Sequence, residues 1–131
     1  MIPGSGTALA PRPSRQTRWS RVNGMGVDAS SQQRIVAVVV AWNRRDLLAQ
    51  TLAGLAAQTR RPDAVVVIDN ASTDDSAALA AAHPVVTEVV TLPTNTGGAG
   101  GFAAGIARAV VRHGAQAVWI MDDDTVPTPT A

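Results

Sequence analysis

The sequence predicts an α/β protein built on a parallel sheet of four strands that alternate with three helices. From residue 35 onward, short apolar runs rich in valine alternate with longer amphipathic stretches. These stretches are long enough to carry the chain from one parallel strand to the next by right-handed crossovers. Polar clusters follow the apolar runs directly, which is where an open parallel sheet binds its ligands.

The composition allows a single soluble domain. Hydrophobic residues make up 46% of the 131 residues, which is enough to bury a core. The absence of cysteine excludes disulfides, zinc–thiolate sites and thiol nucleophiles. The longest apolar stretch, 35–42, is far shorter than the about 20 residues of a membrane-spanning helix, and no signal peptide is recognisable. We therefore expect a cytoplasmic protein, either free or peripheral to the inner face of the membrane.

Residues 1–33 predict a disordered extension, because they are rich in Pro, Ser, Gly and Arg and follow neither a helical nor a strand period. Met25 is an alternative start of translation, which would shorten this extension. Its arginines are not interleaved with aromatic side chains that stack on bases, so the basic charge does not indicate nucleic-acid binding. The folded domain is expected over 34–131.

The first strand, first helix and second strand are expected over 35–41, 46–58 and 64–68. The run 35–41 is dense in valine and too short for a helix, as is typical of a buried strand. Asp46 is expected to cap the helix, and Pro62 separates the helix from the second strand. The apolar face of this helix consists of Leu48, Leu52 and Leu55.

A short helix over 75–82 and a third strand over 85–92 come next. Ser72 or Thr73 is expected to cap the helix, and the nearby aspartates suit its N-terminal dipole. Three polar residues make the third strand less apolar than the others, which predicts a position at the edge of the sheet. They are Thr87, Glu88 and Thr91.

A third helix over 100–113 and a fourth strand over 117–121 complete the predicted sheet. Gly114 supplies a left-handed exit from the helix, and the basic residues of its last turn suit the negative end of the helix dipole. The face of this helix that we expect to be buried consists of Phe102, Ile106 and Val110.

Every unusual polar cluster follows one of the predicted strands. Because the carboxyl ends of parallel strands share one edge of a sheet, we expect these clusters to converge on one site. In chain order they are Asn43 with Arg44, Asp69 with Asn70, Asn95 with the glycines that follow it, and Asp122 with Asp123 and Asp124.

The acidic triplet predicts a metal site. Three adjacent carboxylates repel one another, and at the end of a buried strand this repulsion is weakly screened unless a cation is present. Asp122 and Asp124 alternate along the chain and can face one ion. Their hard oxygen ligands suit Mg²⁺ or Mn²⁺, which bridge carboxylates to a diphosphate and neutralise a phosphate leaving group. The alternative is a solvated turn, which the nearby Thr125 and Pro127 favour.

The glycine-rich segment 95–102 opens the third helix, where free N–H groups attract an anion and glycine permits close approach. Asn95, Gly97 and Gly98 are therefore candidate contacts of a diphosphate or a sugar. In the alternative interpretation these glycines only shape a helix-initiating turn. Asp69 is either the first residue of an Asx-turn or an acceptor of hydrogen bonds from a base or ribose.

Three stretches of the chain together resemble family 2 glycosyltransferases of the GT-A fold, a Rossmann-like fold. The likeness is strongest to the bacterial galactofuranosyltransferases and rhamnosyltransferases, and it covers nearly everything from Ile35 onward. The order and spacing of the stretches make it specific. They are VVVAWNR at 38–44, QTRRPD at 58–63 with VIDNASTD at 67–74, and NTGGAGGF at 95–102 with WIMDDD at 119–124.

The resemblance implies that 34–131 is the nucleotide-sugar-binding half of such an enzyme. The donor would be of the UDP-galactofuranose or dTDP-rhamnose type, and the acceptor a cell-envelope glycan or a lipid-linked sugar. The loop at Asn43 and Arg44 would hold the base together with Asp69. The glycine segment would face the donor. Asp122 and Asp124 match the outer aspartates of the family's D-x-D motif, which holds Mn²⁺ or Mg²⁺ on the diphosphate, with Asp123 near the ribose or sugar.

One departure from the family concerns the acceptor-binding half, which in such enzymes supplies the general base. The chain stops at Ala131, seven residues after the triplet, and no residue matches that base. We therefore expect this polypeptide to bind a nucleotide sugar but not to transfer it unaided. We also expect exposed apolar surface where that half would pack, and poor solubility as its consequence.

Three other readings remain open. The run Asp122 to Val126 fits the D-x-D-x-T/V pattern of haloacid-dehalogenase-type phosphatases, although there the motif ends the first strand. The segment 98–103 is a formal G-x-G-x-x-A of a dinucleotide-binding domain, although that motif belongs in the first βα turn. The third reading is a non-catalytic nucleotide-binding fragment.

Overall fold

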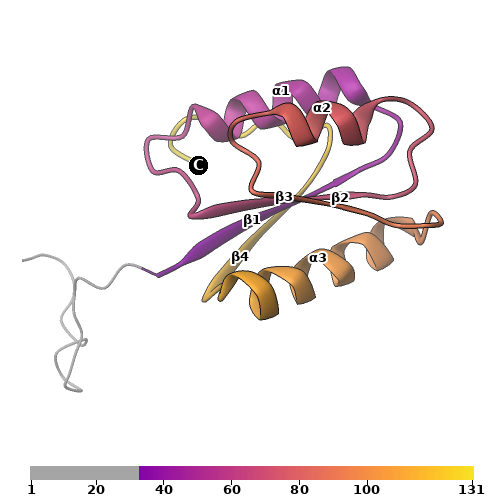
Figure 1. Cartoon of the computed structure of the whole chain (residues 1–131). Coiled ribbons are helices and arrows are strands. Elements are labelled where there is room, and N and C mark those ends of the chain that lie inside the picture. The colour runs from indigo at the N-terminus through magenta and orange to yellow at the C-terminus, as the bar shows by residue number, and fades with distance from the viewer. Residues whose placement is uncertain (1–32) are drawn as a thin grey trace, which may run out of the picture. The chain divides into compact units, whose positions relative to one another are not determined.

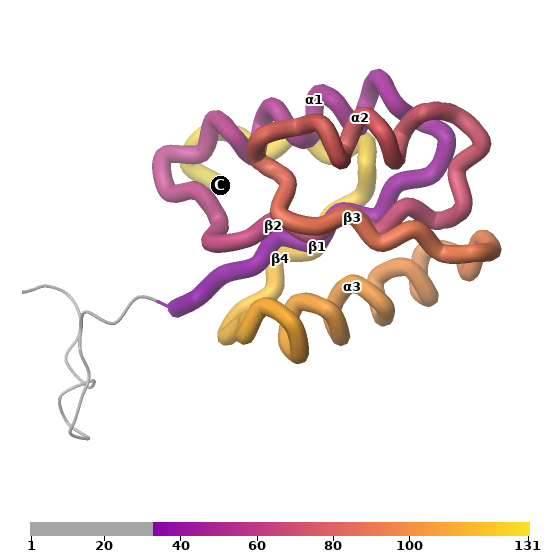
Figure 2. Tube along the Cα trace, in the orientation of Figure 1, coloured from indigo at the N-terminus to yellow at the C-terminus, as the bar shows by residue number. Residues whose placement is uncertain are grey.

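The computed structural model describes residues 33–131, so the extension predicted over 1–33 lies outside the described residues, Gln33 apart. Four strands alternate with three helices, as the sequence predicts (Figures 1 and 2). No helix within 33–131 has the length and apolar character needed to cross a membrane. The elements are β1 (Ile35–Ala41), α1 (Arg45–Ala56), β2 (Ala64–Asp69), α2 (Ser76–Ala82), β3 (Glu88–Thr91), α3 (Gly97–His113) and β4 (Ala117–Asp122).

The four strands form one parallel sheet in the order β3-β2-β1-β4. The chain builds the sheet outward from β1 to β3 and then crosses back to place β4 on the other side of β1. Strand order therefore reverses between β1 and β4, which is the switch point where open α/β sheets bind ligands. The register pairs Val40 of β1 with Asp122 of β4, so the loops that follow these two strands begin side by side.

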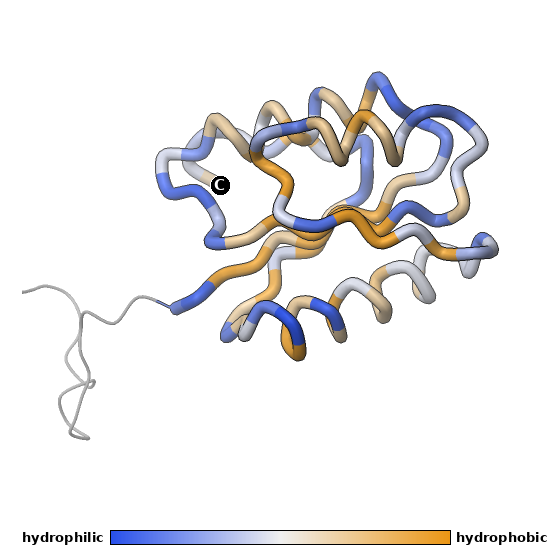
Figure 3. The backbone as a smooth tube through the Cα atoms, viewed as in Figure 1, coloured by the Kyte–Doolittle hydropathy of each residue, from blue (hydrophilic) through white to orange (hydrophobic). Residues whose placement is uncertain are grey.

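Helices cover both faces of the sheet. Helices α1 and α2 lie on one face and α3 lies on the other (Figure 1). Alternate residues of β1 belong to different cores: Val39 packs with the leucines of α1, and Val38 packs with Ala109 of α3. A strand buried on both faces needs apolar residues at every position, which explains the valine-rich runs. Figure 3 shows the result, a hydrophobic middle of the sheet with hydrophilic loops at the strand ends.

The predicted buried face of α3 is wrong in part. Phe102 packs against the core, but Ile106 is 39% exposed and Val110 is 50% exposed. The buried positions of α3 are instead Gly101, Gly105 and Ala109. The helix lies so close to the sheet that a Cβ on Gly105 would come within 2.2 Å of Cγ1 of Val38. The close approach of α3 to the sheet, and not the hydrophobicity of its side chains, therefore determines which face of the helix is buried.

The two predicted N-terminal caps are wrong. Helix α1 begins at Arg45, so Asp46 lies inside its first turn, where a negative charge still suits the helix dipole. Helix α2 begins at Ser76, and neither Ser72 nor Thr73 caps it. The N-cap residue is Asp75, whose side chain makes no capping bond. The Asp74 carboxylate, one residue earlier, accepts hydrogen bonds from the backbone N–H of Ser76 at 3.0 Å and from its hydroxyl at 2.6 Å.

The later boundaries differ from the prediction by several residues. Strand β3 is shorter than expected, but its position at the edge of the sheet is confirmed. Helix α3 begins three residues earlier, at Gly97, whose N–H is accepted by the Asn95 side chain at 2.7 Å. Gly114 ends α3 with a φ of 64°, as predicted.

Candidate functional site

The acidic triplet is joined to the β1–α1 loop at the switch point. The backbone N–H of Trp42 donates a hydrogen bond of 2.9 Å to Oδ2 of Asp123. The Thr51 hydroxyl of α1 donates another of 2.9 Å to the backbone oxygen of Asp123. The middle residue of the triplet is therefore held through both its carboxylate and its peptide group.

Asp123 is buried and its two neighbours are not. Its exposed fraction is 5%, whereas Asp122 and Asp124 are exposed. Burial raises the pKa of Asp123, because it penalises the charged form. The Trp42 N–H and the Arg44 guanidinium oppose this rise in pKa, and the charges of the two neighbouring aspartates add to it.

Arg44 supplies the positive charge closest to the triplet. Its Nη1 lies 3.1 Å from Oδ2 of Asp124 and 3.8 Å from Oδ1 of Asp123. The backbone N–H of Thr125 donates to the Asp122 oxygen at 3.2 Å, so the triplet also forms the turn that the sequence offered as an alternative. The turn and a ligand-binding role are compatible, because the turn uses a backbone oxygen and leaves the outer carboxylates exposed.

The outer aspartates fit a metal ion whose remaining ligands come from the substrate. Within residues 33–131, no group of three or more His, Asp or Glu side chains is assembled that could hold a metal ion. The triplet offers two exposed carboxylates, Asp122 and Asp124. Mg²⁺ is commonly bound by one or two carboxylates together with substrate phosphates, and Mn²⁺ accepts the same oxygen ligands. The donor set therefore fits a cation shared with a diphosphate.

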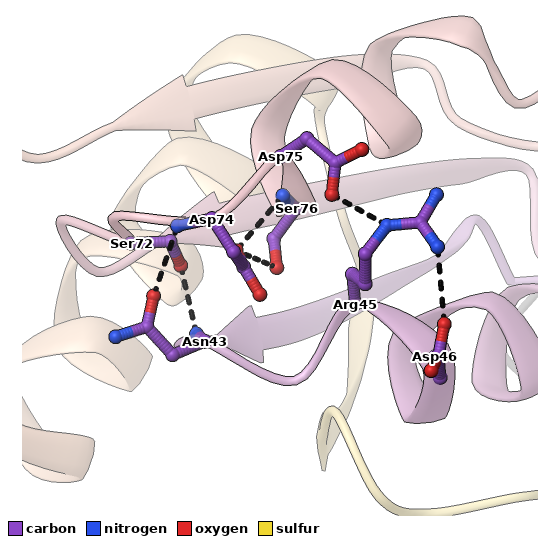
Figure 4. A network of polar contacts seen from close by, with 7 residues as sticks. All are labelled: Asn43, Arg45, Asp46, Ser72, Asp74, Asp75 and Ser76. Atoms are coloured by element: carbon purple, nitrogen blue, oxygen red, sulfur yellow. Dashed lines mark hydrogen bonds and ion pairs between the residues drawn. The ribbon is translucent and has the colours of Figure 1, made fainter.

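Asn43 shapes the β1–α1 loop and ties it to the loop after β2. It adopts a φ of 50°, in the left-handed region that asparagine tolerates. Its Oδ1 accepts from the backbone N–H of Thr73 at 2.7 Å and of Asp74 at 3.3 Å. Its own N–H donates to the Ser72 hydroxyl at 3.0 Å (Figure 4). The side-chain oxygen of Asn43 is therefore engaged within the protein.

Charged residues reinforce the same junction. Arg45 lies between the two loops, with Nε 2.5 Å from Asp75 and Nη1 3.0 Å from Asp46 (Figure 4). These side chains are largely exposed, so each pair contributes little alone. Together with Asn43 they hold the loops after β1 and β2 as one surface.

Asp69 ends β2 and Asn70 follows it directly, and both are buried. Oδ1 of Asp69 accepts from the Ser72 N–H at 3.3 Å, which is the local role the sequence allowed. An ionised carboxylate has about four lone-pair positions, so this one contact leaves acceptor capacity for a ligand. Asp69 thus lies at the carboxyl end of its strand, as predicted, and already has a hydrogen-bond partner in the loop that follows it.

Asn70 is the residue whose importance the sequence did not reveal. Its Nδ2 donates to the oxygen of Gly97 at 3.0 Å, and its Oδ1 accepts from the N–H of Thr96 at 2.9 Å. Its backbone N–H donates to Ala41 at the end of β1. Asn70 therefore links the ends of β1 and β2 to the start of α3. Its position directly after a buried strand was the available signal.

The glycine segment divides into two functional parts. Gly97 and Gly98 face open space, since a Cβ at either position would meet nothing within 4 Å. Gly97 also needs its glycine for a φ of 74°. Gly101, by contrast, lies against the sheet, where a Cβ would come within 2.7 Å of Cγ1 of Val40. Only the first part, next to Asn95, is accessible to a ligand.

The structure thus connects the predicted site residues through three junctions. Trp42 and Arg44 join the β1 loop to the triplet, Asn43 joins it to the β2 loop, and Asn70 joins the β2 loop to the glycine segment. The sequence predicted that these clusters converge, and it did not identify the contacts that connect them.

Comparison with curated proteins finds galactofuranosyltransferases among the relatives of this chain. The chain is 45% identical over 94 residues to galactofuranosyltransferase GlfT1 of Mycobacterium tuberculosis, a match that covers 70% of this chain and 31% of the relative. It is 40% identical over 96 residues to GlfT1 of Mycolicibacterium smegmatis, covering 73% of this chain and 32% of the relative. The chain therefore spans about a third of the length of these relatives.

Solved structures share the fold. The mannosyltransferase PcManGT from Pyrobaculum calidifontis, in complex with GDP-Man and Mn²⁺, matches with a TM-score of 0.55 and 28% identity, over 72% of this chain and 28% of that one. TarS 1-349 of S. aureus in complex with UDP matches with a TM-score of 0.58 and 25% identity, over 74% of this chain and 29% of that one.

The family model for glycosyl transferase family 2 matches residues 36–131, which is most of the chain. This match agrees with the position of the triplet, which ends β4 and not the first strand as in the phosphatase alternative. It also agrees with the glycine segment, which opens α3 and not the first helix as in the dinucleotide-binding alternative. The chain belongs to the family 2 glycosyltransferases and has part of the GT-A fold.

Proposed function

We propose that residues 34–131 bind the nucleotide diphosphate of a sugar donor for transfer to a glycan or lipid-linked acceptor of the cell envelope. A donor of the UDP-galactofuranose type is favoured by the 45% identity to a galactofuranosyltransferase, with dTDP-rhamnose as the second candidate. The observation that carries the proposal is the junction at the switch point, where the Trp42 N–H holds Asp123 at 2.9 Å. It joins the base-binding loop to the diphosphate-binding triplet.

Each part of the site has a proposed role. The loop at Asn43 and Arg44, whose shape depends on Asn43, holds the base together with the carboxylate of Asp69 at the end of β2. Asp122 and Asp124 hold Mn²⁺ or Mg²⁺ on the donor diphosphate, with Asp123 fixed between them and close to the ribose or sugar. Asn95, Gly97 and Gly98 face the donor. When bound, the metal stabilises the negative charge that develops on the diphosphate leaving group.

The first test is metal-dependent nucleotide binding by the purified chain. Calorimetry should give tighter binding of UDP with MnCl₂ than without it. Asp122→Asn and Asp124→Asn should each reduce the manganese enhancement by at least about tenfold, as changes to metal sites typically do. Asp46→Asn is the matched control, because Asp46 is an exposed acid on α1 and should leave the enhancement unchanged.

Other outcomes would support different functions. Manganese enhancement that survives in both triplet variants would contradict the metal role of Asp122 and Asp124. Tight binding of NAD without metal would favour a dinucleotide-binding domain. We assign no general base within 34–131, so we expect the chain to bind donor without transferring sugar. Sugar transfer by the purified chain would contradict that expectation, whereas binding without transfer in a longer protein would favour a non-catalytic role.

A further inference from the structure

We propose that Thr51 of α1 and Gln58, two residues beyond the end of α1, are positioning residues that hold the acidic triplet in its binding geometry. This inference rests on the proposed function, because it concerns how the metal-binding carboxylates are oriented. Both residues are buried and polar, at 0% and 6% exposure, and Thr51 lies on a helix face otherwise built of leucine. A buried polar group destabilises the fold unless it is hydrogen-bonded, so the partners of these two side chains indicate their purpose.

Partners of both side chains lie in residues 123–129, which run from the middle of the triplet into the segment after it. The Thr51 hydroxyl donates to the backbone oxygen of Asp123 at 2.9 Å, and Nε2 of Gln58 donates to the backbone oxygen of Thr128 at 2.6 Å. Nε2 of Gln58 also donates to the backbone oxygen of Gly54 in α1 at 3.1 Å. Further along, the N–H of Thr59 donates to the Pro129 oxygen at 2.9 Å. The chain leaving β4 therefore runs back along α1, as the yellow C-terminal trace shows in Figure 1.

Gly54 permits this contact. A Cβ on Gly54 would come within 2.9 Å of Cδ of Pro127, so the segment packs directly on the helix backbone. Positions 51 and 54 share one side of α1, since residues three apart are neighbours, and Gln58 comes directly after the end of the helix at Ala56 and its C-cap Ala57. They form a continuous contact, here called the α1 clamp and defined as Thr51, Gly54 and Gln58.

The α1 clamp acts on the triplet through Asp123. The Thr51 hydroxyl of α1 donates a hydrogen bond to the backbone oxygen of Asp123, and the Trp42 N–H of the β1–α1 loop donates one to its carboxylate. Its peptide group orientation determines the direction of the two neighbouring aspartates, which carry the proposed metal ligands. Groups that orient metal ligands typically change metal affinity by about 10- to 100-fold when they are lost.

The test compares two variants of one residue. Thr51→Val keeps the shape of the side chain but removes the hydroxyl, whereas Thr51→Ser keeps the hydroxyl. The readout is the ratio of UDP affinity with MnCl₂ to UDP affinity without it, measured by calorimetry on the full chain. Thr51→Val should lower this ratio by about tenfold and Thr51→Ser should restore most of it. Loss of general stability would lower both affinities together and leave the ratio unchanged.

Two further variants make the result decisive. Ala109→Gly weakens α3, on the opposite face of the sheet, and should lower the melting temperature without changing the ratio. Gln58→Met removes the second contact of the α1 clamp and should lower the ratio by a smaller factor than Thr51→Val. If Thr51→Val does not fold, an unchanged ratio in Gln58→Met overturns the proposal.

The outcomes separate this inference from the proposed function. A wild-type chain whose UDP binding does not respond to manganese overturns both. A wild-type chain that responds, together with a Thr51→Val variant that responds equally, overturns the α1 clamp alone and leaves the nucleotide-binding site standing.

Discussion

The ion pair that Arg44 makes with the triplet and the role proposed for it at the base compete with each other. Its guanidinium lies 3.1 Å from Asp124, the carboxylate proposed to hold the metal, and it is also the proposed contact of the base. The Arg44 guanidinium therefore offsets part of the negative charge of the triplet, and a divalent ion bound there as proposed would compete with it. Such an arrangement lowers the electrostatic repulsion among three adjacent aspartates without a ligand.

This competition predicts effects of opposite sign in Arg44→Gln. Binding of Mn²⁺ alone should become tighter by about two- to fivefold, because an exposed ion pair of up to ~1 kcal/mol no longer opposes it. Binding of UDP should become weaker, because the base loses its contact. Electron paramagnetic resonance of free Mn²⁺ measures the first effect and calorimetry the second. Weaker binding of both ligands would show that Arg44 does not compete with the metal.

The hydrogen bonds of Asp74 predict that the stability of the protein depends on pH. The hydrogen bond from the Ser76 hydroxyl, aided by the backbone N–H groups of Ser76 and Arg45, lowers the pKa of Asp74 below 3.8 in the folded state. A lowered folded-state pKa contributes stability that is present above the unfolded pKa and is lost as pH falls through the folded pKa. This contribution is therefore complete at neutral pH and disappears below about pH 4.

Removing the Asp74 carboxylate should reproduce that loss at neutral pH. Asp74→Ala should destabilise the protein by about 1 kcal/mol at pH 7, comparable with the loss of a helix cap. The difference from wild type should shrink as pH falls below about 4 and towards the lowered folded-state pKa, where the wild-type carboxylate becomes protonated. Denaturant unfolding at several pH values measures this difference, with Asp46→Ala as the control, because Asp46 is a largely exposed acid. A difference that stays constant with pH would contradict the assignment.

At the scale of elements, α3 is the helix whose packing departs most from a hydrophobic pattern. Its buried face is made of Gly101, Gly105 and Ala109, which lets the helix axis approach the sheet closely. The N-terminus of α3 begins with Gly97 and Gly98, where an added Cβ would meet nothing within 4 Å, so packing does not explain these glycines. The same residue type therefore serves packing in the middle of α3 and access at its start.

Two alanine substitutions distinguish these roles. Gly105→Ala should destabilise the protein by about 1–3 kcal/mol, because its Cβ would come within 2.2 Å of Val38 and overpack the core. Gly98→Ala should stabilise α3 by about 0.5–1 kcal/mol, because alanine favours a helix and the added methyl meets open space. Thermal unfolding measures both. Equal effects of the two substitutions would contradict the division.

Gly98→Ala also bears on the donor site. If Gly98 contacts the donor as proposed, the variant should be more stable and yet bind UDP more weakly. A variant that is more stable and binds UDP normally would restrict the donor contact to Asn95 and Gly97.

At the scale of the whole molecule, apolar residues are exposed on α3 and β4. Val111 is 82% exposed and Ile120 is 47% exposed, in addition to the exposed residues of α3 described above. Strand β4 lies at one end of the strand order within residues 33–131. An apolar strand at the edge of a sheet promotes association with other chains.

This surface predicts self-association of the chain. Ile120→Lys should raise the concentration at which the purified chain remains monomeric, because a charge on an edge strand opposes pairing. Light scattering over a concentration series measures it. Thr125→Lys adds the same charge at an exposed position outside the strands and should have a smaller effect. Equal improvement by both variants would attribute the effect to net charge alone.

The local pattern of the sequence was sufficient for most of the fold. The valine runs predicted β1 and β2 because each strand is buried on both faces, and Leu48, Leu52 and Leu55 predicted the buried face of α1 because they recur at helical spacing. The same pattern predicted that polar clusters meet at one edge of the sheet, since parallel strands end there together. These features depend on residues that are near neighbours in the chain.

Tertiary structure alone decided which side chains hold the site together. Asp123 receives its hydrogen bond from Trp42 across 81 positions of sequence, and Asn70 reaches the glycine segment across 27. No periodicity encodes such contacts, because they depend on strand order and on how closely a helix approaches the sheet. For the same physical reason the buried face of α3 was mispredicted: hydrophobicity is a property of each residue, whereas close approach is a property of the assembled fold.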